Sequence, residues 1–322
     1  MATYLVTGAA GFIGSSIAEA LLARGETVRG FDNLSTGKME NVQPLIGHGL
    51  EFVEGDLRNA DDCARACEGV DFVFHEAALP SVPKSVMDPV TSHRSNIEGT
   101  LNLLMAAREA RVRRIVYAGS SSAYGDTPTL PKHEDMKPSP ISPYAVQKLC
   151  GELYLQSFAQ VYGMETVTIR YFNVFGPRQD PTSAYSGVLA KFTMMMLEGK
   201  EPMIFGDGSQ SRDFTYISDV VNANLLAMHA PAEKVSGKVF NVACNVEIDL
   251  NQAAEALRQI TGYTGPVHYG PEREGDVKHS LADITAAERA FGYKPQVTFA
   301  EGLRRTVDWY KEQEQFANAV VR

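Results

Sequence analysis

Short apolar segments alternate with longer amphipathic segments from the N-terminus to Pro177, and this alternation limits the possible folds more than any other feature. The segments with strand-like composition are Tyr4–Thr7, Thr27–Phe31, Leu50–Val53, Phe72–Phe74, Arg114–Ala118 and Thr166–Tyr171. Helical periodicity lies between them, for example in Ile13–Ala23 and Ile97–Ala110. Strands that alternate with helices predict βαβ units, and therefore an α/β fold with a doubly wound parallel sheet.

The alternation weakens after Pro177, where a short helix near Lys191–Glu198 and a loop-rich stretch over Pro202–Phe214 are predicted. A chain of 322 residues has room for about two domains. We expect a larger domain over residues 1–180 and a smaller α/β domain over residues 181–322. The boundary is soft, because such a second domain can borrow returning segments. Ligands bind at the carboxyl ends of parallel strands, so the second domain is expected to cover that crevice and bind the substrate.

Composition excludes several classes of protein. The 39 acidic and 30 basic side chains give a net charge of -9, which disfavours nucleic acid as a partner. No apolar run reaches the roughly 18 residues of a membrane span, and the N-terminus lacks the pattern of a signal peptide. We therefore expect a cytoplasmic protein that binds no membrane. The four cysteines are expected to be reduced thiols, and the scattered histidines predict no metal site.

A glycine-rich loop follows the first predicted strand in the sequence TGAAGFIG, where Gly8, Gly11 and Gly14 enclose Phe12 and Ile13. Such glycines permit a tight turn, close approach of a pyrophosphate and close packing of helix on strand. Asp32 ends the second strand, and its separation from Gly14 is near the roughly 20 residues expected for an acid that binds the adenosine ribose. A carboxylate there repels a 2′-phosphate, so the sequence predicts a Rossmann-type domain that binds NAD rather than NADP.

Asp56 ends the third strand in the sequence EGDL, and two roles remain open for it. Its carboxylate could reach the adenine edge of the dinucleotide, or it could cap the helix that follows.

Tyr144 and Lys148 form a YxxxK pattern in a helical stretch that opens after Pro143. Residues four apart share a helix face, so the phenol and the ammonium point into one pocket. A neighbouring cation, joined by the positive charge of oxidised nicotinamide, favours phenolate, and such a tyrosine can act as a general base. The alternative is a surface tyrosine above a solvated lysine. The preceding serine cluster in AGSSSAYG and the dinucleotide loop favour the catalytic interpretation.

At these residues the chain resembles the extended short-chain dehydrogenase/reductase superfamily, and more closely its nucleotide-sugar 4-epimerases for UDP-galactose and UDP-N-acetylglucosamine. The motifs that carry the resemblance are TGAAGFIG, DNLSTG, GDL, HEAA, NIEGTLNLL, SSSAYG, SPYAVQK, RYFNVFGPRQ, IFGDGSQSRDFTYISDV and REGDVKHSLAD. The resemblance implies that Tyr144 and Lys148 handle the proton and that Ser120 hydrogen-bonds the sugar 4-oxygen. Whether Ser120, Ser121 or Ser122 does so stays open.

The resemblance also implies two sets of binding residues. The expected NAD contacts are Gly8, Gly11, Phe12, Ile13, Gly14, Asp32, Asn33, Ser35, Gly37, Asp56, Leu57, Ala77, Ala78, Asn96, Tyr144, Lys148 and Tyr171. The expected contacts with a UDP-sugar are Ser81, Lys84, Ser85, Ser120, Ser121, Ser122, Tyr144, Asn173, Val188, Leu189, Phe205, Arg212, Arg273, Asp276 and Ser280. Among these, Arg212 and Arg273 are expected to clamp the pyrophosphate, since guanidinium groups suit phosphate oxygens.

Related dehydratases and decarboxylases carry one or two acids where this chain has Ser121 and Ser122. Without a carboxylate there, the site can take hydride from C4, hold a 4-keto sugar and return hydride to the opposite face. We therefore expect inversion at C4 of UDP-Glc and UDP-Gal. Ser280 is small where glucose-restricted relatives carry tyrosine, so UDP-GlcNAc and UDP-GalNAc are expected to fit as well.

A UDP-glucuronate 4-epimerase is the enzyme alternative, kept open by Arg178 and Lys191 in the segment that follows FGP. A catalytically silent NAD(H)-binding regulator is the alternative from another class, disfavoured because Tyr144 and Lys148 are both present. The resemblance further suggests a homodimer formed through the helices around Ile97–Ala110 and Tyr144–Tyr162.

Overall fold

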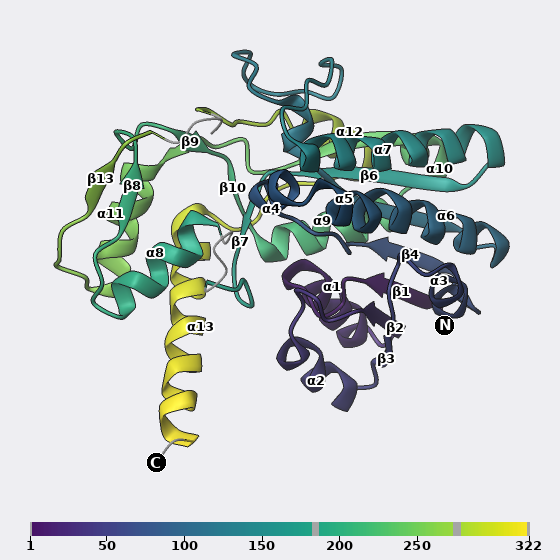
Figure 1. Ribbon diagram of the computed structural model, residues 1–322, viewed down its shortest axis with the longest axis horizontal. Coiled ribbons are helices and arrows are strands. Elements are labelled where there is room, and N and C mark those ends of the chain that lie inside the picture. Colours follow the sequence, from purple (N-terminus) through teal and green to yellow (C-terminus); the bar gives the residue numbers. More distant parts are fainter. Residues whose placement is uncertain (1, 182–186, 273–277, 321–322) are drawn as a thin grey trace.

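A seven-stranded parallel sheet is the centre of the molecule (Figure 1). The computed structural model describes residues 2–181, 187–272 and 278–320. The strands of the sheet are β1 (Thr3–Thr7), β2 (Thr27–Asp32), β3 (Glu51–Glu54), β4 (Phe72–His75), β5 (Arg114–Ser120), β6 (Glu165–Tyr171) and β11 (Lys238–Val242). Their spatial order is β11-β6-β5-β4-β1-β2-β3. The order in which the chain adds strands reverses between β1 and β4, which is where ligands bind in such sheets.

The six strands predicted from the sequence are all present, and the Rossmann-type α/β fold is confirmed. The last strand, β11, was not predicted. It comes from the second half of the chain and pairs with β6 in parallel, with Lys238 opposite Val167. A segment beyond residue 180 therefore completes the first sheet, while the division at that residue stays a proposal.

Helices cover both faces of the sheet. One face carries α1 (Phe12–Ala23), α2 (Met39–Gly47) and α9 (Ile217–His229). The other face carries α3 (Ala60–Cys67), α6 (Gly99–Glu109) and α7 (Pro143–Tyr162). Each layer packs through its own apolar cluster, because both faces of a parallel sheet need cover.

The connections between these layers contain α4 (Val82–Met87), α5 (Pro89–His93), the π-helical turn η1 (Arg94–Glu98) and the 3₁₀ turn η2 (Ser121–Tyr124). The helix predicted over Ile97–Ala110 is thus divided: its first residues belong to η1, and α6 begins at Gly99.

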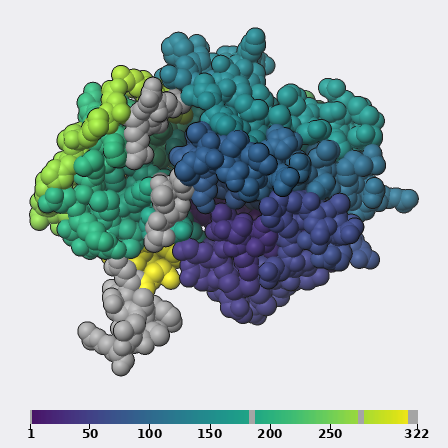
Figure 2. Space-filling view, viewed as in Figure 1, coloured from purple at the N-terminus to yellow at the C-terminus, as the bar shows by residue number. Residues whose placement is uncertain are grey.

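The second half of the chain forms a smaller body beside the sheet, drawn green and yellow in Figures 1 and 2. Its helices are α8 (Val188–Leu197), α11 (Leu250–Thr261) and α13 (Phe299–Val320). The helices α10 (Ala232–Val235) and α12 (Thr285–Phe291) also come from this half of the chain, but they pack against β6 and β11 of the large sheet. The short strands of the smaller body pair as β7 (Asn173–Phe175) with β10 (Phe214–Tyr216), β8 (Met203–Phe205) with β13 (His268–Gly270), and β9 (Ser211–Arg212) with β12 (Ile248–Asp249). In the described part of the chain, no helix is long and apolar enough to cross a membrane.

Local sequence explains where α7 begins and ends. The Ser142 side chain accepts a hydrogen bond from the Ala145 amide at 3.2 Å, and Pro143 occupies the first turn, where its missing N–H costs nothing. Gly163 ends the helix in a left-handed conformation with φ of 68°. These caps place Tyr144 in the first turn and Lys148 one turn later, both beside the carboxyl end of β5.

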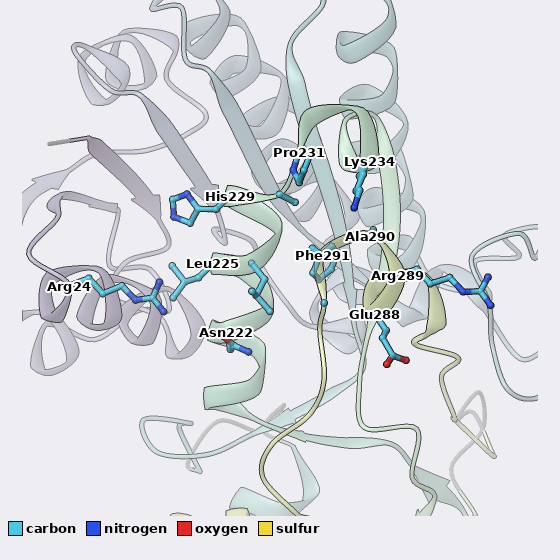
Figure 3. A pocket seen from close by; sticks show the side chains of 13 residues that line it. Arg24, Asn222, Leu225, His229, Pro231, Lys234, Glu288, Arg289, Ala290 and Phe291 are labelled. Carbon is cyan, nitrogen blue, oxygen red and sulfur yellow. The ribbon is translucent and has the colours of Figure 1, made fainter.

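A hollow of about 510 Å³ lies at the end of the sheet opposite to Tyr144 and Lys148 (Figure 3). It is enclosed by the ends of α1 and α9 and by the helices α10 and α12. Arg24, His229, Lys234 and Phe291 are among its lining residues. Arg114, the first residue of β5, donates hydrogen bonds to carbonyl oxygens at the end of α9. The hollow therefore lies at the amino ends of the strands. No predicted site residue lines this hollow.

Candidate active site

The glycine loop between β1 and α1 has no room for side chains at two positions. Gly8 has φ of +68°, and a Cβ there would lie 2.8 Å from the Ala77 nitrogen. A Cβ at Gly14 would lie 2.1 Å from the Gly8 carbonyl oxygen. Gly11 caps α1 without a side-chain hydrogen bond, so the first amides of α1 stay open to a ligand. Open amides at a helix N-terminus fit the pyrophosphate of a dinucleotide.

Asp32, at the end of β2, is held by main-chain groups. Its carboxylate accepts hydrogen bonds from the Ala10 amide at 3.0 Å and from the Leu34 amide at 2.8 Å. Burial raises the pKa of Asp32, and these amides oppose the rise. Gly37 lies against the same carboxylate, since a Cβ there would be 3.0 Å from its Oδ2. This arrangement fits the acid predicted to meet the adenosine ribose.

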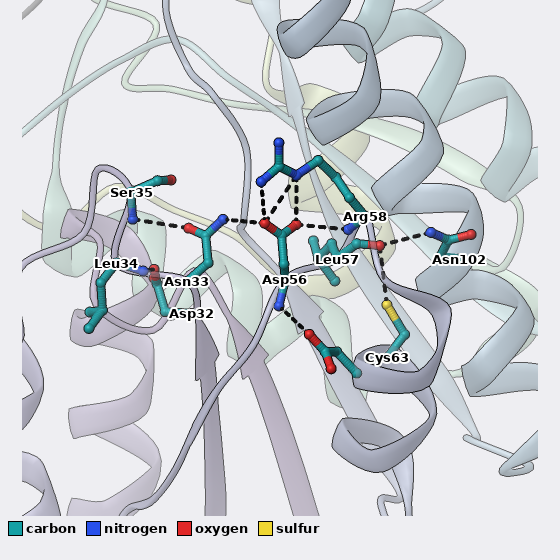
Figure 4. Close-up of polar contacts among 10 residues, drawn as sticks. Asp32, Asn33, Leu34, Ser35, Asp56, Leu57, Arg58, Cys63 and Asn102 are labelled. Atoms are coloured by element: carbon teal, nitrogen blue, oxygen red, sulfur yellow. Dashed lines mark hydrogen bonds and ion pairs between the residues drawn. The ribbon is translucent and has the colours of Figure 1, made fainter.

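Asp56 lies in a polar cluster beside Asp32 (Figure 4). Its carboxylate accepts from the Asn33 side chain at 3.0 Å and pairs with Arg58 at 2.5 Å. The hydrogen bond from Arg58 lowers the pKa of Asp56 to about 2. Asn59, not Asp56, caps α3 by accepting from the Asp61 amide at 3.0 Å. The helix-cap alternative for Asp56 is therefore wrong, and contact with the adenine side of the cofactor stays a prediction.

Other predicted cofactor residues support these loops. Ser35 donates its amide to the Asn33 side chain at 3.0 Å, and the Leu57 carbonyl accepts from Asn102 at 2.9 Å. The amide of Ala77 donates to Thr7 Oγ1 at 3.2 Å and turns the chain after β4 toward the glycine loop.

Asn96 is buried, and it bonds both the amide and the carbonyl of Leu79. It also donates to the Gln147 side chain at 2.8 Å. In the structure Asn96 thus holds the loop that contains Ala78. Direct contact between Asn96 and the cofactor stays a prediction.

Tyr144, Lys148 and Ser120 meet at the carboxyl end of β5. The Ser120 side chain hydrogen-bonds the Tyr144 phenol. Burial raises the pKa of Tyr144 to about 12, and the hydrogen bond from Ser120 opposes this rise. The Lys148 ammonium donates to the Ala118 carbonyl at 2.8 Å, and burial lowers the pKa of Lys148 to about 8. The alternative of a solvated lysine under a surface tyrosine is wrong, because Lys148 is buried.

The neighbouring serines divide by their contacts. Ser122 lies 2.8 Å from Ser120, oxygen to oxygen, and its amide donates to Ser120 Oγ at 3.2 Å. Ser121 begins the 3₁₀ turn η2. The hydrogen bond to Tyr144 therefore favours Ser120 as the serine that acts with the tyrosine.

His75 is the last residue of β4, and Glu76 follows it. No role for either residue was predicted from the sequence. His75 lies between the hydroxyls of Thr7 and Thr100, each 2.9 Å from a ring nitrogen, and burial lowers its pKa to about 3. Glu76 Oε1 accepts from the Tyr171 hydroxyl at 2.9 Å. Both residues lie in the HEAA motif, and an acid directly after a buried strand was the signal available for Glu76.

Three residues predicted to line the sugar pocket belong to α4 or cap it, and α4 packs against α7. Ser81 caps α4 by accepting from the Lys84 amide at 3.2 Å. Ser85 is fully buried, and its hydroxyl accepts from the Tyr144 amide at 3.0 Å. Ser85 thus fixes the start of α7, while contact of these residues with a sugar stays a prediction.

The remaining substrate candidates lie on short elements that follow β6 in the chain. Asn173 begins β7, Phe205 ends β8, and Arg212 ends β9. Val188 opens α8 and is half-buried, whereas Leu189 is 2% exposed and belongs to the core. Leu189 therefore has little surface to offer a ligand. Arg273 and Asp276 lie outside the described residues.

Ser280 lies beside β9, where its amide donates to the Ser211 carbonyl at 3.2 Å. Side chains hold this segment in place: the Ser211 hydroxyl donates to Glu247 and lies 2.8 Å from His279 Nδ1. The Ser280 side chain is buried, and its role at the sugar pocket stays a prediction.

Comparison with known proteins agrees with this geometry. The NAD dependent epimerase/dehydratase family matches residues 4–243. UDP-glucose 4-epimerase of Mycolicibacterium smegmatis is 40% identical over 97% of this chain and 99% of its own length. The structure of UDP-glucose 4-epimerase from Thermotoga maritima with UDP-glucose has a TM-score of 0.92 and 40% identity, covering 97% of this chain and 99% of its own. UDP-N-acetylglucosamine 4-epimerase from Methanobrevibacter ruminantium, in complex with UDP-N-acetylmuramic acid, has a TM-score of 0.90 and 41% identity, covering 97% and 98%.

The expected extended short-chain dehydrogenase/reductase resemblance, the enzymatic character and the NAD cofactor are thereby confirmed. The family match agrees with the glycine loop, with Asp32 and with the Tyr144–Lys148 pair at the carboxyl end of the sheet. The chain therefore belongs to the NAD dependent epimerase/dehydratase family.

Proposed function

We propose that this enzyme inverts C4 of a UDP-hexose through a transient 4-keto sugar. The observation that carries the proposal is the contact of Ser120 with Tyr144, beside a buried Lys148, at a strand end where Ser121 and Ser122 replace the acids of dehydratases. This set of groups can move the proton of a sugar 4-hydroxyl and offers no carboxylate at those two positions to eliminate water from the sugar.

Tyr144 supplies the proton transfer in this scheme. As a phenolate it takes the proton of the 4-hydroxyl, and as a phenol it returns that proton to the 4-keto oxygen. Since burial raises the pKa of Tyr144 to about 12, positive charge is needed to form the phenolate near neutral pH. Lys148 provides part of that charge from the same helix face, and Ser120 orients the phenol by its hydrogen bond.

The open amides of α1, the acid at Asp32 and the polar cluster at Asp56 would hold NAD. Bound NAD supplies the hydride acceptor and donor at C4. Gly8 and Gly14 lie in places where a side chain would not fit, so the main chain of the loop can come close to the cofactor. This close approach would help the protein retain the cofactor through the reaction cycle.

The sugar specificity is proposed to include N-acetylated sugars. Ser280 is buried and small, and it lies on the segment clasped by Ser211, Glu247 and His279. A small side chain there leaves volume for a 2-acetamido group. We propose UDP-Glc and UDP-Gal as substrates, together with UDP-GlcNAc and UDP-GalNAc.

The substrate proposal is tested by proton NMR of the purified enzyme with UDP-Glc, UDP-GlcNAc and UDP-glucuronate in separate samples, without added NAD. Galacto-type anomeric signals from the first two support the proposal and a retained cofactor. Conversion of UDP-glucuronate alone would favour the uronate alternative. If no sugar is converted even after NAD is added, the silent NAD(H)-binding alternative takes its place.

A homodimer formed through the α6–α7 side is the proposed assembly. A groove of about 490 Å³ lies between α5, η1 and the start of α7, lined by Pro89, Ile97, Ile141 and Val146 among others. On α7, Val146 and Leu153 are 44% and 53% exposed and lie two turns apart on one helix face. Exposed apolar side chains grouped in this way are typical of protein interfaces.

Sedimentation analysis of wild type and Leu153→Glu tests the dimer. We expect the wild type to sediment as a dimer and the variant as a monomer, because the new carboxylate would be buried unpaired in the interface. Val246→Glu, which replaces an exposed apolar residue in the second half of the chain, is the control for a general effect of charge. A wild type that sediments as a monomer would refute the proposal.

A further inference from the structure

Asp213, between β9 and β10, has a fully buried side chain to which the reaction proposed above assigns no role. Its Oδ1 accepts a hydrogen bond from the Cys244 amide at 2.8 Å. Its Oδ2 accepts from the Asn245 amide at 2.9 Å and from the Ala282 amide at 3.2 Å. One carboxylate thus joins the stretch between β11 and β12 to residues 278–283, which we call the Ser280 segment.

The Ser280 segment begins as a parallel partner of β9. The Ser211 amide donates to the Lys278 carbonyl at 3.0 Å, and the Ser211 carbonyl accepts from the Ser280 amide at 3.2 Å. If this ladder continued, the Ala282 amide would donate to the main-chain carbonyl of Asp213. It donates to the carboxylate of Asp213 instead.

The Asp213 carbonyl is already used, because the chain changes its partner there. This carbonyl accepts from the Asn173 amide at 3.1 Å, and β10 pairs with β7 from Phe214 onward. The Asp213 side chain therefore supplies the acceptor that the main chain no longer offers to the segments beside β9. A buried amide without an acceptor is costly, so a carboxylate at this position stabilises both segments.

Arg212 depends on the same contacts. It ends β9, and the sequence predicted that it clamps the pyrophosphate of the substrate. Its Nη1 donates to the Ser211 carbonyl at 2.8 Å and to the Lys278 carbonyl at 3.2 Å. The position of the guanidinium therefore follows the position of the Ser280 segment, which Asp213 holds.

The ionised side chain is suited to this role. Burial raises the pKa of Asp213 to about 6, and the main-chain amides that donate to it oppose the rise. At neutral pH the group is an anion whose two oxygens accept from three amides. Asparagine has one acceptor oxygen, and its NH₂ group would face an amide donor, so at least one buried amide would lose its partner.

We propose that Asp213 is a positioning residue for substrate binding, whose carboxylate fixes the Ser280 segment and thereby holds Arg212 where it can bind the diphosphate of UDP. The inference rests on the proposed function and on the clamp predicted for Arg212. Proton transfer at Tyr144 does not involve Asp213 in this scheme. Loss of the carboxylate should therefore weaken binding and leave the chemical step unchanged.

Asp213→Asn and the matched control Asp219→Asn test the proposal. Asp219, in the first turn of α9, is also buried, and it accepts from the Gln296 and Val297 amides at 3.0 and 3.1 Å. No predicted site residue lies on that segment. Calorimetry measures the binding of UDP to the NAD-loaded proteins. We expect the Kd of UDP to rise at least roughly tenfold in Asp213→Asn and less than about twofold in Asp219→Asn.

Turnover of a UDP-sugar separates binding from chemistry. In Asp213→Asn, KM should rise by a similar factor while kcat stays within about threefold of wild type. An unchanged Kd in Asp213→Asn, or equal weakening in both variants, would overturn the proposal. A wild type that binds no UDP would overturn the proposed function together with this inference. A wild type that binds UDP but inverts no sugar would refute the function alone, because calorimetry still decides the role of Asp213.

A second measurement uses the wild type and does not depend on the folding of a variant. Amide hydrogen exchange is compared with and without UDP. If the contacts of Asp213 position the binding site, bound UDP must in turn stabilise those contacts. We expect UDP to slow exchange at least roughly fivefold at the three amides that donate to Asp213, and less than about twofold at the two that donate to Asp219. Equal protection of the two groups, or none at the first, would overturn the proposal.

Discussion

The cofactor side and the substrate side of the site differ in how much of their structure depends on side-chain contacts. On the cofactor side, main-chain groups define the shape: Gly8 lies against Ala77, and the Ala10 and Leu34 amides hold Asp32. On the substrate side, main-chain hydrogen bonds to Ser211 hold the segment that contains Ser280, and contacts among the side chains of Ser211, Glu247 and His279 add to them. A site shaped by main-chain geometry tolerates few substitutions, whereas a site held by side-chain contacts can change its shape after few mutations. The comparison therefore predicts that few substitutions in the cofactor site preserve NAD binding, whereas single substitutions in the sugar site can change its specificity.

Tyr144→Phe acts where the two sides meet, and we expect its effect to be the largest. Removing the phenol should lower kcat roughly a thousandfold, because the general base is lost. Bound NAD should remain, since the glycine loop and Asp32 are untouched. Steady-state kinetics and the cofactor content of the purified protein check both parts. Tyr162→Phe, an exposed position at the end of α7, is the control and should behave as wild type.

Gly14→Ala tests the rigidity of the cofactor side. Its Cβ would lie 2.1 Å from the Gly8 carbonyl oxygen, so helix and loop must separate. We expect about 3 kcal/mol of destabilisation and loss of bound NAD. Gly47→Ala is a matched control, because a Cβ at this last residue of α2 meets nothing within 4 Å. The control should change stability by less than about 1 kcal/mol. Equal thermal unfolding of the two variants would contradict the comparison.

Ser280→Tyr tests the adaptability of the substrate side. The larger ring should occupy the space for the acetamido group and lower kcat/KM for UDP-GlcNAc relative to UDP-Glc at least roughly tenfold. Ser280→Ala keeps the volume and should leave that ratio near the wild-type value. Competition of the two sugars in one NMR sample measures the ratio directly. Unaltered N-acetyl turnover in a folded Ser280→Tyr enzyme would contradict the gate.

Arg58→Ala should have the smallest effect, because the Arg58–Asp56 pair is partly exposed and screened by solvent. We expect less than about 1 kcal/mol of destabilisation at neutral pH. The folded pKa of Asp56, about 2, lies below its usual value, so the pair stabilises the fold above about pH 4 and loses this effect as pH falls toward about 2. Urea unfolding at neutral and acid pH should show the two proteins converging at the acid end. A loss well beyond the roughly 1 kcal/mol that an exposed ion pair contributes would mean that Asp56 organises the cofactor side.

The sequence predicted those parts of the molecule that depend on neighbouring residues. Six strands and the glycine loop followed from local apolar patterns and from Gly8, Gly11 and Gly14. The strand β11 could not be predicted, because it pairs with a strand that lies far earlier in the chain, Lys238 opposite Val167. Glu76 stood in a noted motif, but its orientation depends on Tyr171, which also lies far away in the sequence. Contacts between such distant segments decide which polar side chains face the site, and a single sequence does not display them.

The position of β11 at the edge of the sheet has a consequence for biosynthesis. Until Lys238–Val242 leaves the ribosome, the outer edge of β6 has no partner, and its free amides and carbonyls can recruit another strand. A nascent chain interrupted before that point is open to aggregation even though its glycine loop and Tyr-Lys pair are already complete. Substitutions in β11 should therefore reduce the yield of soluble protein during expression more than the turnover of the molecules that mature.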